Sequence, residues 1–309
     1  MGLEALNTSV GAFLAGRPPN GPDDGVATGV PGLYAYEFPA PTVPTVSLYV
    51  PIACLTMQGG KALELGSTVH HFVPGDTTIV SHDLPVTSRI TQASGETPYR
   101  ALVMAIDLTV LRSLYTQMAD LGLTEGAVED TASSPSADIA SVSVGPAAPG
   151  FIDALARYFT LAEKPAEVAM LAPLIQRELH YRLLMTPHAA GLRRLLPVNS
   201  HDSRIGRSIQ HMRQHFRRPL AVTDLARLAG MGVSSFHAHF RAITATTPLQ
   251  YQKDLRLIEA RRLLGEGELS VAATAYDVGY ESATQFSREY ARKFGTPPSR
   301  DPALSVGAA

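Results

Sequence analysis

Histidines in the first third of the chain are the first residues that could carry metal chemistry. His70, His71 and His82 lie close together in an apolar, turn-punctuated stretch. A metal site needs three or four nitrogen, oxygen or sulfur ligands that converge on one point. The sequence holds no His-x-His pair followed by a nearby Glu and a later His. We therefore expect no metal, no cofactor and no catalytic residue, and we expect the protein not to be an enzyme.

Cys54 is the single cysteine, and two interpretations of it stay open. A single cysteine excludes an internal disulfide framework and fits a reducing cytoplasm. In an apolar strand a free cysteine often serves as a small buried hydrophobe. A thiol that instead lines a pocket and reacts with an electrophile or an oxidant must be exposed and have a lowered pKa. The local sequence shows no neighbouring positive charge, although Lys61 could approach across a hairpin.

The last hundred residues contain a repeated unit whose exposed side chains could read bases. An alanine and a glycine recur 49 residues apart, and two aromatic residues recur 50 residues apart. The pairs are Ala226 and Ala275, Gly230 and Gly279, Phe236 and Phe286, and Phe240 and Tyr290. Two copies at nearly one spacing favour a repeated DNA-binding unit over a plain helical hairpin.

Each copy has a physical logic. The small alanine lets two helices cross closely, and the glycine can adopt positive φ to end the first helix. Ser234 and Ser282 are placed to cap the second helix of each copy. The aromatic pair at i and i+4 anchors that second helix in the core. Its opposite face is thereby left free to enter a major groove.

Charge separates along the chain, although the net charge is only −2. Residues 201–300 hold 15 Lys or Arg and 9 Asp or Glu, while the rest holds 11 and 19. A basic region in an otherwise acidic chain suggests a surface that binds a polyanion.

The elements that position these residues are predicted from periodicity. A length of 309 residues suggests two domains. No run of 18 apolar residues predicts a membrane span, and the N-terminus lacks the basic, then apolar pattern of a secretory signal. Short β-branched segments between glycine turns predict a sandwich or small barrel. The predicted parts are a flexible arm over 1–32, strands over 33–106, helices over 107–121, 151–162, 166–185 and 189–196, a loop over 124–149, and a linker over 197–203.

The C-terminal hundred residues resemble the AraC-type transcription regulators. Besides the repeated unit, the resemblance rests on Thr247-Pro248-Leu249-Gln250-Tyr251, on Arg256-Leu257 with Ala260-Arg261-Arg262-Leu263-Leu264, and on Phe294-Gly295-Thr296-Pro297-Pro298. The resemblance implies a DNA-binding domain over 204–300, followed by a disordered tail over 301–309. It also implies a long helix, about 248–264, that fixes two helix-turn-helix units. Their recognition helices would enter successive major grooves of double-stranded DNA.

The resemblance also nominates DNA-contacting residues by position. Ala238 is small where relatives often place a longer polar residue. Its side chain cannot form a hydrogen bond with a base, so it could only make a methyl contact with thymine. Gln285 could pair with adenine, and Arg288 could contact a guanine edge or only a phosphate. Arg261 and Arg262 could instead be structural, pairing within the domain. The nominated residues are Ser234, Ser235, His237, Ala238, Arg241, Ala283, Thr284, Gln285, Ser287, Arg288 and Arg292.

The N-terminal half resembles the sensing domain of one AraC-type subgroup. The resemblance rests on the segments 51–61, 74–75, 81–86, 98–102 and 177–184. It implies an α+β protein in which a cupin-like β-barrel with accessory helices, over 33–196, senses a small molecule and forms a homodimer. The ligand-binding candidates are Cys54, Met57, His71, His82 and Arg100.

We therefore expect a cytoplasmic, sequence-specific DNA-binding transcription regulator that responds to a small-molecule effector. If it is an activator, it would also contact RNA polymerase. Two alternatives stay open, namely a constitutive DNA-binding dimer and a cupin enzyme fused to a DNA-targeting domain.

Overall fold

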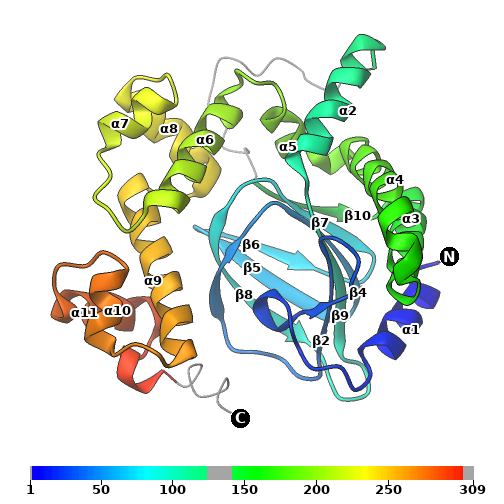
Figure 1. Cartoon of the computed structure of the whole chain (residues 1–309), viewed down its shortest axis with the longest axis horizontal. Helices are drawn as coiled ribbons and strands as arrows, with labels where there is room; N and C mark the ends of the chain where they lie inside the picture. Colours follow the sequence, from blue (N-terminus) through cyan, green and yellow to red (C-terminus); the bar gives the residue numbers. More distant parts are fainter. Residues whose placement is uncertain (1, 124–140, 302–309) are drawn as a thin grey trace.

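A computed structural model describes residues 2–123 and 141–301 and divides them into a sheet-rich N-terminal part and an all-helical C-terminal part (Figure 1). In Figure 1 helices α1, α3 and α4 run along one side of the sheets, and the C-terminal helices lie on the other side. The expected α+β class, with a β domain followed by a helical domain, is confirmed.

Two antiparallel sheets form the N-terminal domain. The larger has the strand order β1-β2-β9-β4-β7-β10 and the smaller β3-β8-β5-β6. The strands are β1 (Val26–Ala27), β2 (Leu33–Phe38), β3 (Thr45–Tyr49), β4 (Ile52–Gln58), β5 (Gly60–Leu65), β6 (Thr68–Phe72), β7 (Asp76–Val80), β8 (Leu84–Gln92), β9 (Tyr99–Ala105) and β10 (Val142–Pro146). Because successive side chains alternate between faces, the larger sheet presents one face to the helices and the other to the smaller sheet.

The helices of this domain bury the outer face of the larger sheet in the main hydrophobic core. They are α1 (Leu3–Leu14), α2 (Leu108–Asp120), α3 (Pro149–Thr160), α4 (Pro165–Leu184) and α5 (Ala190–Leu195), with short 3₁₀ turns at Pro22–Asp24, Leu161–Glu163 and Pro187–Ala189. The Asp107 carboxylate caps α2 by accepting from the backbone N–H groups of Thr109 and Val110.

Two expectations for this half need correction. The predicted flexible arm over 1–32 is wrong because α1 places Leu6 and Val10, both fully buried, in the main core. The predicted loop over 124–149 is wrong at its end, where β10 pairs with β7 along its whole length. Residues 124–140 of that loop lie outside the described residues.

The C-terminal domain consists of two helix-turn-helix units joined by one long helix. Its helices are α6 (His201–His215), α7 (Val222–Leu228), α8 (Val233–Thr244), α9 (Pro248–Glu266), α10 (Val271–Asp277) and α11 (Ala283–Phe294), followed by a 3₁₀ turn at Pro298–Arg300. Each unit has its own core, and residues of α9 belong to both. Helix α9 therefore fixes the two units relative to each other.

The ends of this domain also differ from expectation. Helix α6 begins at His201, capped by the Ser200 hydroxyl, so the predicted linker over 197–203 is helical in its last residues. Asp301 was expected in a disordered tail, but it is buried and accepts hydrogen bonds from Arg261 and Tyr290. The rest of that tail, 302–309, lies outside the described residues.

Candidate nucleic-acid interface and effector cavities

Helix α8 presents every nominated residue of the first unit to solvent. Ser234, Ser235, His237, Ala238 and Arg241 are all exposed. The aromatic residues at the intervening positions of the helix are fully buried. The apolar face of α8 therefore anchors the helix and leaves the opposite face open for a groove.

The cap of α8 differs from expectation. Helix α8 begins at Val233, its N-cap is Gly232, and no side chain caps it, so Ser234 lies inside the first turn. In the second unit Ser282 does cap α11, with its hydroxyl accepting from the Gln285 N–H at 3.3 Å. The second unit has one more residue in its turn, which places its serine at the cap.

Helix α11 exposes part of its nominated face and uses part of it internally. Thr284, Arg288 and Arg292 are exposed, whereas Ala283 is half-buried against the core of the second unit. Ser287 is also half-buried, and its hydroxyl donates to the Ala283 carbonyl at 2.9 Å. The exposed Gln285 amide donates to Glu289 at 3.2 Å. A base contact by Gln285 would therefore compete with an internal hydrogen bond.

Much of the basic charge of this domain is already paired internally. Arg261 forms an ion pair with Asp301 at 2.9 Å, and Lys293 forms one with Asp254 at 2.9 Å. Arg256 donates to the Phe216 carbonyl. Among the nominated residues, the cations Arg241, Arg288 and Arg292 form no hydrogen bond or ion pair within the described part of the chain, so all three are available for DNA. Arg262 also pairs internally, with Glu259 and Glu266.

A cavity of about 450 Å³ lies between the two sheets. Its walls are mostly apolar and aromatic, and they include Tyr36, Tyr49 and Tyr99. Cys54 from β4 and Lys61 from β5 also line it. The Lys61 ammonium lies over the Tyr49 ring, 5.3 Å from its centroid, in a cation–π contact. The cavity is therefore mainly apolar, and its charged lining residues are Lys61, Arg89, Asp23 and Asp24.

The electrostatics of this cavity favour a protonated thiol and a charged amine. Burial raises the pKa of the Cys54 thiol, and the nearby Lys61 opposes that shift only partly. Burial alone would lower the pKa of Lys61, but Tyr49, Cys54 and Asp23 outweigh it and raise that pKa. A buried thiol with a raised pKa is a poor nucleophile at neutral pH, which favours the structural interpretation of Cys54.

The structure does not bring the other ligand candidates to this cavity. Met57 is buried in the main core beneath the helices, and His71 is exposed on β6. Arg100 pairs with Glu37 at 2.5 Å. His82 lines a different cavity. Sequence reasoning did not nominate the three tyrosines or Lys61 as lining residues, although a lysine inside an otherwise buried strand was an available signal.

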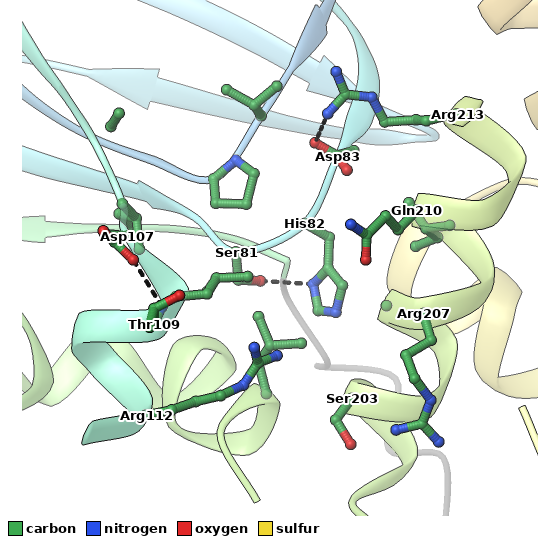
Figure 2. A pocket seen from close by; sticks show the side chains of 18 of the residues that line it. Ser81, His82, Asp83, Asp107, Thr109, Arg112, Ser203, Arg207, Gln210 and Arg213 are labelled. Atoms are coloured by element: carbon green, nitrogen blue, oxygen red, sulfur yellow. Dashed lines mark hydrogen bonds and ion pairs between the residues drawn. The ribbon is translucent and has the colours of Figure 1, made fainter. Parts of the chain in front are cut away.

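A second cavity, of about 630 Å³, lies where the two domains meet (Figure 2). Its walls come from the β7–β8 loop, from the first turns of α2 and from one face of α6. In Figure 2 His82 occupies the middle of the view, between Ser81 and Gln210. Ser81 Oγ and His82 Nδ1 are 2.9 Å apart.

Two further findings bear on the other function classes. Within 2–123 and 141–301 no group of three or more His, Cys, Asp or Glu side chains is arranged to hold a metal ion. No helix in these same ranges is both long and apolar enough to cross a bilayer.

Known proteins resemble both halves of the chain. Residues 29–191 match the AraC-type transcriptional regulator N-terminus, and residues 225–301 match a helix-turn-helix domain family. The regulator CdhR of Pseudomonas aeruginosa is 31% identical over 145 residues, which are 47% of this chain and 40% of CdhR. ExsA of the same organism is 28% identical over 131 residues, 42% of this chain and 47% of ExsA. The matches thus span less than half the length of these relatives.

Solved structures share the fold of most of the chain. ToxT from Vibrio cholerae, bound to (E)-4-(8-methylnaphthalen-1-yl)but-3-enoic acid, superimposes with a TM-score of 0.58 at 12% identity, over 90% of this chain and 98% of ToxT. ToxT bound to an unsaturated fatty acid gives a TM-score of 0.55 at 9% identity, over 87% of this chain and 92% of ToxT. The first family covers more than half of the residues and the second covers both recognition helices. The chain therefore belongs to the AraC-type transcriptional regulators.

Proposed function

We propose that this protein is a sequence-specific DNA-binding transcription regulator whose activity responds to a small molecule bound in its N-terminal domain. The DNA-binding part of this proposal rests on one observation. Helix α9 holds two helix-turn-helix units, and their exposed faces carry Arg241, Arg288 and Arg292 without internal partners among the described residues. Such arginines can contact guanine edges or phosphates. The regulator would act in the cytoplasm, and as an activator it would also contact RNA polymerase.

A footprint on the DNA around its own gene tests this proposal. Arg288→Ala should weaken specific binding about 10- to 100-fold if the guanidinium contacts a base, because such contacts contribute about 1–3 kcal/mol. Arg177→Ala removes the same charge from α4, where Arg177 bonds Gln117, and should leave the footprint intact. Wild-type protein that shows no salt-sensitive footprint would contradict the proposal.

We infer that the effector is an apolar molecule with a carboxylate, bound in the cavity between the sheets. The aromatic walls suit an apolar body. The Lys61 ammonium forms no ion pair among the described residues, although the Asp23 carboxylate in the same lining acts on it electrostatically, and this ammonium suits an anionic head. Both ToxT ligands named above are carboxylic acids of apolar character. This agreement in ligand chemistry supports the inference.

Titration calorimetry with the naphthyl-butenoic acid and its primary alcohol tests the effector class. Lys61→Met should weaken binding of the acid about 10-fold or more and leave binding of the alcohol unchanged. Arg89→Gln is the matched control, because Arg89 also lines the cavity but lies 3.9 Å from Glu64. Equal binding of acid and alcohol to wild type would contradict the carboxylate assignment. No binding of either would favour the constitutive DNA-binding dimer.

We also propose that two copies associate through helix α4. This helix exposes Met170 and Leu174, at 74% and 66%, and also Tyr181. Lys164 and Glu167 flank the stripe. Lys164 and Glu167 pair with each other at 3.7 Å, so the exposed apolar stripe itself is what a second copy would cover in a two-fold interface.

A further inference from the structure

The cavity between the domains is held in place by direct contacts across their boundary. Arg213 on α6 forms an ion pair with Asp83 at 2.7 Å. The Tyr251 hydroxyl on α9 donates to the Asp83 carbonyl at 2.9 Å, and the Ser141 hydroxyl donates to the Ile243 carbonyl at 2.5 Å. These contacts lie on several elements of both domains. Contacts between several elements of the two domains therefore hold the walls of this cavity in place.

The cavity carries positive charge that the protein leaves uncompensated. Arg112 enters from α2 and Arg207 lies along α6 (Figure 2). Arg112 has no hydrogen bond or ion pair within the described ranges, and Arg207 donates only to the Val198 carbonyl, at 3.1 Å. The two carboxylates that line the cavity are already engaged, since Asp83 pairs with Arg213 and Asp107 caps α2.

A buried polar atom in the wall also lacks a partner. The His82 side chain is 4% exposed, and its Nε2 has no hydrogen-bond partner among the described residues. Leaving such an atom unpaired is unfavourable, so a ligand that accepts from it or donates to it would be stabilised. Burial lowers the pKa of His82, and neighbouring Asp202 opposes that shift, so the ring is neutral at neutral pH. The Ser81 hydroxyl has two acceptors within reach, His82 Nδ1 at 2.9 Å and the Ser141 carbonyl at 3.3 Å. When it donates to the nearer Nδ1, Nε2 carries the ring proton and can donate to an anion.

Further donors line the same cavity. The Thr109 hydroxyl and the Gln210 amide form no hydrogen bond with another described residue, and both line the cavity. More than half of the lining residues are polar or charged. The cavity between the sheets, by contrast, is walled mainly by aromatic and aliphatic side chains. An apolar acid therefore suits the cavity between the sheets, and a compact, highly charged molecule suits this one.

We propose that the cavity between the domains is a second effector site, which binds a small organic molecule with two or more anionic oxygen groups. Arg112 from the N-terminal domain and Arg207 from the C-terminal domain hold its two ends, and His82 and Gln210 donate to it between them. Bound in this way, the molecule bridges the domains. It stabilises the arrangement in which the site is formed, to the extent that it binds that arrangement more tightly.

The two cavities are neighbours. Val50 and Ala105 line both of them. An occupant of one therefore changes the packing of a wall of the other. This coupling of two effectors rests on the proposed function of the cavity between the sheets, but anion binding at Arg112 and Arg207 does not.

Calorimetric titration of the full chain with citrate and with pyrophosphate, at matched ionic strength, tests the site. We expect saturable binding of at least one anion, weakened about 10-fold or more in Arg112→Gln/Arg207→Gln and about 3- to 10-fold in each single variant. Arg204→Gln is the matched control, because Arg204 lies on the same helix but does not line the cavity. Arg288→Ala controls for anions that bind the proposed DNA surface, and it should retain binding.

The results distinguish a polycarboxylate from a phosphate-bearing ligand. They also test the second effector site separately from the proposed function. Tighter binding of citrate assigns a polycarboxylate, and tighter binding of pyrophosphate assigns a phosphate ester. Absence of binding by both anions overturns the site, and so does binding that the double variant leaves unchanged. The DNA footprint of the double variant, measured without anion, should equal that of wild type. A wild-type chain that gives no footprint, but binds an anion that the double variant binds more weakly, would overturn only the proposed function.

Discussion

The ion pair between Asp83 and Arg213 should show unequal costs when either partner is removed. The Asp83 side chain is 14% exposed, whereas the Arg213 side chain is 40% exposed. Burial raises the pKa of Asp83 above its ordinary value, and Arg213 opposes that shift only partly. The carboxylate therefore depends on its partner, while the guanidinium can be solvated without it.

The expected loss of unfolding free energy follows from the unequal exposure of the two side chains. Removing one partner of a fully buried pair costs about 3–5 kcal/mol, because the other charge stays buried and unpaired. Water around Arg213 screens this pair, so we expect Arg213→Ala to lower the free energy of unfolding by about 1–2 kcal/mol at pH 7.5. Asp83→Asn removes the buried charge and keeps an acceptor for Arg213, so it should cost less than about 1 kcal/mol.

The pH dependence of the stability penalty in Arg213→Ala is a sharper test. Arg213→Ala removes the group that lowers the pKa of Asp83, so this pKa rises further in the folded variant. The folded variant then binds a proton more readily than the unfolded chain, and its penalty shrinks as pH falls from 7.5 toward 4. Urea denaturation followed by circular dichroism measures both variants across this range. Equal losses of stability for the two substitutions, or a loss in Arg213→Ala that does not change with pH, would contradict this prediction.

Three further predictions concern the N-terminal domain. His180 Nε2 accepts from the Asp107 N–H at 2.8 Å, so His180→Ala should cost about 2 kcal/mol in urea denaturation. Burial lowers the pKa of His180, so the stability that this hydrogen bond contributes is present above about pH 6.5 and is lost as pH falls. A loss of stability in His180→Ala that does not change with pH would contradict this prediction. Leu174→Glu should convert a dimer to a monomer in analytical ultracentrifugation, whereas Glu163→Gln should not; an unchanged mass would exclude the α4 interface. Cys54 should react with iodoacetamide at least 10-fold more slowly in the folded than in the urea-unfolded chain, and equal rates would favour the reactive-thiol interpretation.

The C-terminal domain could be predicted because its signals are local. Glycines 230 and 279 adopt positive φ, and the two aromatic pairs occupy fixed helical spacings. Each of these features acts within about twenty residues, where periodicity and turn chemistry decide the structure. The cap of α8 was predicted wrongly because serine is a better N-cap than glycine, which favoured Ser234, whereas the shorter turn of the first unit places Gly232 at that position.

Long-range features could not be predicted in the same way. Leu6 and Val10 are spaced for a helix, but the proline- and glycine-rich run after residue 16 pointed to a loose arm. Cys54 and Lys61 lie on facing sheets, and no spacing rule specifies which strand faces share a cavity. The cavity between the domains collects residues from loops and helices more than a hundred positions apart. Only the docking of the domains brings them together.

Strand β3 provides the physical connection between the proposed effector cavity and the DNA-binding domain. Leu48 on β3 lines the cavity between the sheets and also packs against the core of the first helix-turn-helix unit. Strand β3 and helix α9 are in contact, and α9 carries both units. An occupant that moves Leu48 therefore acts directly on the helix that sets the spacing of the recognition helices.

Leu48→Ala should separate effector binding from the DNA response. The side chain is half-buried, so its truncation should cost about 1–2 kcal/mol of stability and leave the Lys61 contact intact. We expect the apolar acid to bind within about 3-fold of wild type, while its effect on DNA affinity falls to less than half on a free-energy scale. Val46→Ala, on the same strand but absent from that cavity wall, is the control. A full DNA response in Leu48→Ala would mean that coupling runs through another contact, because a site can influence DNA binding only through an element whose arrangement both ligands bias.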